Sequence, residues 1–353
     1  MSDENLYDVF EVMLSELLSE IPNDDPKYDQ KIEAICRLVV ANGAAYCKEI
    51  FSIAKSKNLK AIRNDTRKFE KRNQNRWAPA IDHLEGLYNW AIEICDVHHQ
   101  YLVDVVGRKS AINNPMKQVL GHVVGKGLVA VGEIIVLIKA GYADGAFARW
   151  RSLHELAVTA QYVAKSGETE ANLYLASFAF QARRALRQTI ELSGIEQVPD
   201  SEKSEADAHC ETAQILIGRK IANDRDGEWP KIAGFNSFYD LEKSLKLDLF
   251  RPVYKLASSY IHSGPQDLQS FLGNQESQTP TMLVGPSSSG MVVPLVYTSL
   301  SLVYLISSLL SRHQKVDFNI LTLAFSELAF EMNALAKEVE AETMRKHFEK
   351  QGA

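Results

Sequence analysis

Between Glu276 and Arg312 the chain carries 35 consecutive residues without a charged side chain. Its most apolar part, residues 291–310, is long enough for an α-helix to cross a bilayer, which takes about 20 residues. Pro294 and several Ser, Thr and Tyr side chains interrupt this part, and we expect no second segment of comparable apolarity. This composition favours a helix buried in the middle of a soluble helical protein, with a membrane helix as the alternative.

Helical periodicity dominates the rest of the sequence. Apolar residues from Leu6 to Leu18 recur at helical spacing, and Pro26 and Pro115 suit the first turns of two longer helices. We expect these two helices to cover about residues 26–57 and 115–140. Further helices are predicted at about 66–106, 144–165, 168–193, 206–222, 238–246, 249–262, 291–313 and 318–350. Alternating strands are hard to find, so the sequence predicts an all-α fold, a multi-helix bundle-like domain with an N-terminal helical extension.

Charge and polarity divide the chain. Residues 55–76 hold nine basic and two acidic side chains, a net charge of +7, whereas the whole chain has 39 basic and 45 acidic side chains. We expect an N-terminal helical region at residues 1–109, which contains this basic strip, and a helical core domain at residues 110–350. The polar, Gly- and Ser-containing stretch 267–290 reads as a surface loop.

The basic strip is a candidate RNA-binding surface, because Lys and Arg side chains neutralise backbone phosphates. The overall acidity of the chain argues against a general nucleic-acid coat but leaves room for such a local site. The alternative is a solvated helix face that pairs with residues 1–25, which hold eight acidic and no basic side chains. The candidate nucleic-acid contacts are Lys60, Arg63, Arg67, Lys68, Lys71 and Arg72.

The sequence predicts no metal site and no cofactor. The four cysteines contain no Cys-x-x-Cys pair, so a zinc cage is not expected. Asp96 and His99 share one face of a helix, but the chain contains no Glu-x-x-His pair of the kind that a di-iron bundle uses twice. Acidic residues stand at the N-terminus where a signal peptide would be basic, so we expect a cytoplasmic location.

The first candidate site is the segment ARWRSLHELAV, residues 148–158. On a helix, Arg151, His154 and Glu155 share one arc, whereas Arg149 falls among the apolar residues on the opposite side. A permanently charged Arg beside a His that titrates near neutral pH suits acid–base chemistry on a phosphate. The alternative is a structural ion pair between Arg151 and Glu155, four residues apart, with His154 filling a polar gap.

The second candidate site is the segment LFRPVYKLASSYIHSGP, residues 249–265. One stripe of this helix carries Arg251, Tyr254, Lys255, Ser258 and His262, before Gly and Pro end it. A His in the last turn is also favoured by the helix dipole alone. If the two helices face each other, their histidines and up to three arginines would meet in one polar cavity.

These two motifs carry a resemblance. RWRSLHELAV, together with Tyr254, Ser258, His262 and the Gly-Pro that follows, resembles a bacterial all-helical family known only as a domain of unknown function, over about residues 110–310. The spacing Arg149-x4-His154 is also similar to the signature of the HEPN superfamily, helical ribonucleases of toxin–antitoxin and phage-defence systems. Those proteins usually carry Asn, Asp or His after the Arg, where this chain has Trp150.

The HEPN resemblance implies a metal-independent endoribonuclease that works as a homodimer. A histidine would act as general base toward a 2′-hydroxyl, an arginine would stabilise the charge on the phosphate, and hydroxyl groups would orient the reacting groups. The competing hypothesis is a non-catalytic sensor or scaffold that binds a small anion or a protein partner. A nuclease needs an open Arg–His pocket, whereas a closed one favours the sensor or scaffold. The catalytic candidates are Arg149, Arg151, His154, Glu155, Tyr254, Ser258 and His262.

Overall fold

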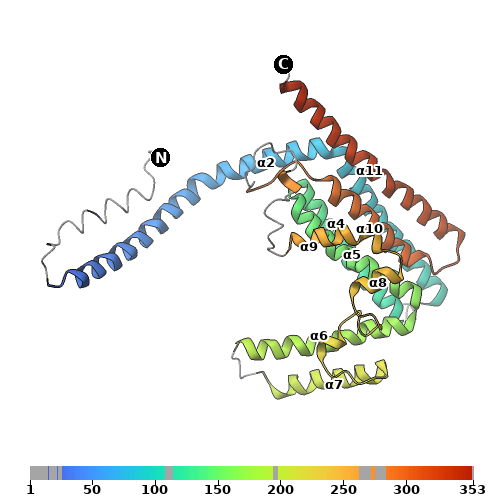
Figure 1. The fold of residues 1–353 in the computed structure, drawn as a ribbon. Helices are drawn as coiled ribbons and strands as arrows, with labels where there is room; N and C mark the ends of the chain where they lie inside the picture. Colours follow the sequence, from blue (N-terminus) through green and yellow to red (C-terminus); the bar gives the residue numbers. More distant parts are fainter. Residues whose placement is uncertain are drawn as a thin grey trace. The chain divides into compact units, whose positions relative to one another are not determined.

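The computed structural model describes residues 26–107, 114–193, 198–261, 272–274 and 284–351, together with Ser15 and Pro22 (Figure 1). These residues form α-helices and short 3-10 helices and contain no strand, which confirms the predicted all-α class. The first helix of the described part, α2 (Tyr28–Val106), is continuous. The predicted interruption between residues 57 and 66 was wrong, and those residues contain no Gly or Pro that would break a helix.

Helix α2 takes part in two compact units, Met1–Lys71 and Arg72–Ala353. The first unit contains the beginning of α2 and most of the basic strip. The second unit contains the end of α2 and the helices from α4 to α11, and therefore the described residues of both candidate sites. The predicted domain boundary near residue 109 stays a prediction, while the division into compact units lies within α2.

The core of the second unit is built around α5 (Ala143–Ser166), which packs against α4 (Pro115–Lys139) and α10 (Val292–Leu310). Helix α11 (Val316–Gln351) covers α10, as Figure 1 shows. The side chain of Trp150 is fully buried, and its indole N–H lies 2.9 Å from both the Tyr297 carbonyl and the Ser301 hydroxyl of α10. The apolar arc of α5 is thereby fixed against α10.

The uncharged stretch forms a core helix. Two of the buried hydroxyls of α10 bond to the backbone of the same helix, since Ser299 Oγ donates to the Leu295 carbonyl at 3.0 Å and Ser308 Oγ to the Leu305 carbonyl at 2.6 Å. Both α10 and α4 are long and apolar enough to cross a membrane, so the expectation of a single such segment was wrong. In their most apolar windows, 56% of α10 and 44% of α4 is buried inside the protein, and core helices pass the same test.

A helical hairpin extends the second unit. Helices α6 (Glu168–Ser193) and α7 (Asp200–Ile217) pack on each other around a small separate apolar cluster that includes Phe180 and Cys210. The helix predicted at about residues 206–222 therefore begins earlier, at Asp200, and ends at Ile217. Two shorter helices, α8 (Phe238–Ser244) and α9 (Arg251–Ser259), return the chain to the side of α5.

The stretch 267–290, predicted as a surface loop, is anchored where the structure describes it. Leu272 and Ser289 are buried, and the Leu272 amide donates to the Asp144 carboxylate at 2.8 Å. The Ser289 hydroxyl donates to the Gly273 carbonyl at 2.6 Å. At these residues the surface prediction was wrong, because the segment seals the beginning of α10 against α5.

Gly290 provides a stability test of this seal. Its φ is +76°, and a Cβ placed there would lie 2.4 Å from the Leu272 carbonyl oxygen. We expect Gly290→Ala to lower the free energy of unfolding by about 2 kcal/mol or more, because backbone strain adds to the clash. Gly86→Ala, in an open helical position of α2, should instead raise it by about 0.5–1 kcal/mol. Urea unfolding followed by circular dichroism checks both signs, and equal stability of the two variants would contradict the close approach.

Candidate functional site

Most of the predicted catalytic residues lie in one polar network between α5, α8 and α9. His154 Nε2 lies 2.9 Å from Glu242 Oε1, and Arg251 donates to Glu242 Oε2 at 2.9 Å. The His154 side chain is 1% exposed and that of Glu242 is 0% exposed. Since a carboxylate only accepts hydrogen bonds, the His154 proton in this contact sits on Nε2. Glu242 thus joins the histidine of α5 to the arginine of α9.

The network continues toward the surface through Tyr254. Its hydroxyl donates to Glu155, whose carboxylate also lies 3.3 Å from Arg151 Nε. The guanidinium groups of Arg151 and Arg251 lie 5.0 Å and 4.8 Å from the centre of the Tyr254 ring. Burial, and then the hydrogen bond to Glu155, raises the pKa of Tyr254 to about 12, so the phenol keeps its proton at neutral pH.

This network is closed and balanced in charge. Its two arginines are paired with two carboxylates. Aromatic rings surround the histidine, and the ring centres of Trp150 and Phe250 each lie 5.3 Å from that of His154. His154 Nδ1 is buried and has no hydrogen-bond partner within the described residues. The arrangement holds its charges by pairing them, as buried ionic groups require, and leaves the imidazole out of reach of solvent.

Three predicted residues are not part of the network. Arg149 forms an ion pair with Glu133 of α4, consistent with its predicted place opposite His154. Ser258 donates its hydroxyl to the Tyr254 carbonyl at 2.8 Å, within its own helix. His262 lies outside the described residues, so the predicted meeting of two histidines stays a prediction. The two helices, whose facing each other was only a condition of that prediction, do meet through Tyr254 and Glu155.

Glu242 is the central residue that the sequence analysis missed. It lies on a seven-residue helix, FYDLEKS, where one acidic side chain among polar neighbours gives no sign of burial. Only the packing of α8 against α5 places it beneath His154.

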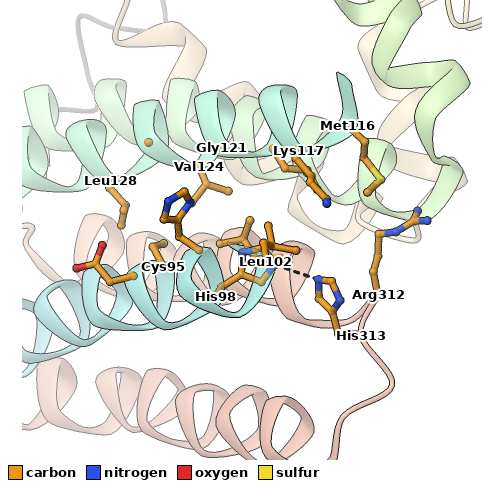
Figure 2. A pocket seen from close by; sticks show the side chains of 15 residues that line it. Cys95, His98, Leu102, Met116, Lys117, Gly121, Val124, Leu128, Arg312 and His313 are labelled. Carbon is orange, nitrogen blue, oxygen red and sulfur yellow. Dashed lines mark hydrogen bonds between the residues drawn. The ribbon is translucent and has the colours of Figure 1, made fainter. Parts of the chain in front are cut away.

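A separate site, which was not among the two candidates predicted from the sequence, is a pocket of about 290 Å³ between α2, α4 and the connection from α10 to α11 (Figure 2). Two histidines meet in it, with His98 Nε2 and His313 Nε2 3.0 Å apart. Lys117 and Arg312 line the same pocket. From the sequence, this part of α2 was interpreted only as a possible metal motif. Its contact with His313 could not be predicted, because His313 is far away in the sequence. In the described part of the chain, no three His, Cys, Asp or Glu side chains gather in a way that could hold a metal ion.

The charges that act on the two histidines of this pocket are predominantly positive. Burial, and then the charges of His313, His99 and Lys117, lowers the pKa of His98 to about 4. Burial also lowers the pKa of His313, with Lys117, Arg312 and Lys315 adding to the effect. Both histidines are therefore predominantly neutral at pH 7, and the charged neighbours that lower their pKa values are cations, although the carboxylate of Asp96 lines the same pocket.

The basic strip belongs to the first unit up to Lys71. Lys60, Arg63 and Arg67 border a shallow hollow on α2, and Lys68 Nζ lies 3.6 Å from the Asp65 carboxylate. Lys71 and Arg72 are exposed. The alternative pairing with acidic residues 1–25 falls outside the described part of the chain, apart from Ser15 and Pro22.

The closed network predicts unequal effects of two charge-removing substitutions. Glu242→Gln removes the carboxylate shared by His154 and Arg251, and we expect it to lower the free energy of unfolding by about 3 kcal/mol. Glu133→Gln removes the partner of the partly exposed Arg149 and should cost less than about 1 kcal/mol. Urea titration of both variants measures the difference, and a Glu242→Gln protein as stable as Glu133→Gln would show that the buried pairing contributes nothing.

Comparison with known proteins identifies a similar family but no known activity. Residues 117–279 match the model of DUF5677, a family of unknown function. This range contains the whole His154 network, and it agrees with the resemblance to a family of unknown function seen in the sequence. No curated protein and no solved structure matches the chain. Over its middle part the chain, which is all-helical in the residues that the structure describes, is thus similar to a family of unknown function.

Proposed function

We propose that this protein is a non-catalytic helical sensor or scaffold, in which the His154 network holds α5, α8 and α9 together. One observation carries the proposal: His154 is 1% exposed, and its partner Glu242 is 0% exposed. A general base must come within hydrogen-bond distance of the proton that it removes. A ribose hydroxyl cannot approach a side chain with so little exposed surface.

The chemistry of the other network members supports the same proposal. Arg151 and Arg251 are each paired with a carboxylate, so the network already balances the positive charge that a phosphate would need. The raised pKa of Tyr254 keeps it a hydrogen-bond donor to Glu155. A polar network whose charges are paired in this way makes one packing arrangement of the helices more favourable than its alternatives.

The metal-independent endoribonuclease is the second candidate, with RNA as the partner. The observation that favours it is the basic strip, where Lys60, Arg63 and Arg67 surround a hollow and have no carboxylate partner among the described residues. Exposed cations in a row suit the phosphates of a single strand. The homodimer predicted from the sequence belongs to this second candidate, and the predicted cytoplasmic location is compatible with both candidates. Both stay predictions.

RNA integrity separates the two candidates. We expect purified protein, incubated with single-stranded RNA and EDTA, to leave the RNA intact, and His154→Ala to change only the stability. Glu133→Gln serves as a folded control, with circular dichroism on each protein. Chelator-resistant cleavage by the native chain and by Glu133→Gln, lost in a His154→Ala protein that is still folded, would overturn the sensor or scaffold proposal.

The basic strip makes a separate prediction under the second candidate. Replacing Lys60, Arg63 and Arg67 together with Gln should weaken binding of a fluorescent single-stranded RNA and reduce the slope of log K against log salt by about 2, since each phosphate contact contributes about 0.7. The matched control replaces Lys126, Lys165 and Lys220, which are exposed elsewhere, with Gln. Fluorescence anisotropy measures both, and equal effects of the two triple variants would mean that the strip has no specific role.

A further inference from the structure

The pocket between α2 and α4 differs from the His154 network in its charge. Lys117 is half-buried on the first turn of α4 and has no carboxylate partner among the described residues. Arg312 donates from one terminal nitrogen to the Ala164 carbonyl at 2.6 Å, which orients the guanidinium and leaves its other N–H groups available. Figure 2 shows Lys117, Arg312 and His313 at one end of the pocket. This end concentrates donors and positive charge.

The other end of the pocket is predominantly apolar. Leu120, Val124 and Leu128 of α4 form one wall, and Figure 2 shows Leu128 and Cys95 away from the cationic end. Burial, and then the neighbouring Asp96, raises the pKa of Cys95 to about 11, so its thiol is neutral and adds to the uncharged surface. The pocket therefore offers a charged end and an apolar end to one ligand.

We infer that this pocket binds a small phosphate ester, with its phosphate among Lys117, Arg312 and the His98–His313 pair and its organic part along the apolar wall of α4. The inference names a ligand for the proposed sensor. Its biological role as a sensed ligand rests on the proposed function, whereas the binding itself does not. It makes no use of the His154 network.

The class of ligand follows from charge and size. A phosphate dianion offers several acceptor oxygens to a lysine, an arginine and imidazole N–H groups, whereas a carboxylate offers one charge and two oxygens. A volume of about 290 Å³ lies at the lower end of the range of small-molecule pockets, about 300–1,000 Å³. This volume fits a small ester and is too small for an oligonucleotide.

The histidine pair couples binding to a proton. At 3.0 Å, one ring nitrogen donates and the other accepts, so the pair holds at least one neutral imidazole. The groups around it are His99, Asp96 and Cys95 of α2, Lys117 of α4, and Arg312 and Lys315 of the α10–α11 connection. The positive charges of Lys117, Arg312 and Lys315, which Asp96 offsets only in part, disfavour a further proton while the pocket is empty. A bound dianion cancels this repulsion, so binding takes up a proton and strengthens as the pH falls from 8 toward 5.5.

Isothermal titration calorimetry on the full chain tests the site with three probes: phenyl phosphate, inorganic phosphate, and a 5′-phosphorylated oligonucleotide. Phenyl phosphate should bind more tightly than inorganic phosphate, because its ring covers the apolar wall. Lys117→Gln should weaken phenyl phosphate binding about tenfold, the effect of losing one charged hydrogen bond. Lys117→Arg should retain binding, which shows that a loss in Lys117→Gln comes from the charge. Lys126→Gln, on the exposed face of the same helix, is the matched control and should bind like the native chain.

Sulfate tests the proton, because its charge is constant between pH 5.5 and 8. We expect its affinity to rise about fivefold or more over this range as the pH falls, and His98→Asn to remove the dependence. The inference is overturned if phenyl phosphate does not bind, if Lys117→Gln and Lys126→Gln behave alike, or if only the oligonucleotide binds. None of these outcomes changes the RNA-integrity result for His154→Ala, so failure of this site and failure of the proposed function are distinguishable.

Discussion

The burial of two predominantly apolar helices, α4 and α10, is the constraint on which the rest of the second unit depends. Helix α5 covers both with its apolar arc, and Trp150 fixes that arc by donating to the backbone and a hydroxyl of α10. Once this arc is committed, the opposite arc of Arg151, His154 and Glu155 can only face the returning helices α8 and α9. The polar network is therefore a consequence of how the core closes, and its residues must find partners there because an unpaired buried charge is too costly.

Charge balance distinguishes the two polar clusters of this protein. In the His154 network, the carboxylates of Glu155 and Glu242 match two arginines, and Tyr254 donates a further hydrogen bond to Glu155. In the α2–α4 pocket, Lys117 and Arg312 face two neutral histidines, and the carboxylate of Asp96 offsets their two positive charges only in part. A balanced cluster stabilises the fold by itself, whereas an unbalanced one gains free energy when an anion arrives.

Local spacing made part of this predictable. The pairing of Arg151 with Glu155 follows from four-residue spacing, and the meeting of α5 with α9 follows from two helices that each carry a polar stripe. Glu242 and His313 could not be predicted, because their roles depend on contacts across 88 and 215 residues of chain. The continuity of α2 was missed for a different reason: a weak apolar pattern reads as a break, although no residue between 57 and 66 ends a helix.

The matched family range bears on the two clusters differently. Residues 117–279 include every member of the His154 network but, of the cationic groups in the pocket, only Lys117. His98 precedes this range, and Arg312 and His313 follow it. The matched residues contain every partner of the pairing that joins α5, α8 and α9 but lack most of the cationic end of the pocket. The network is thus a property of the matched segment, whereas an anion site of this composition requires α2 and the α10–α11 connection to close around α4.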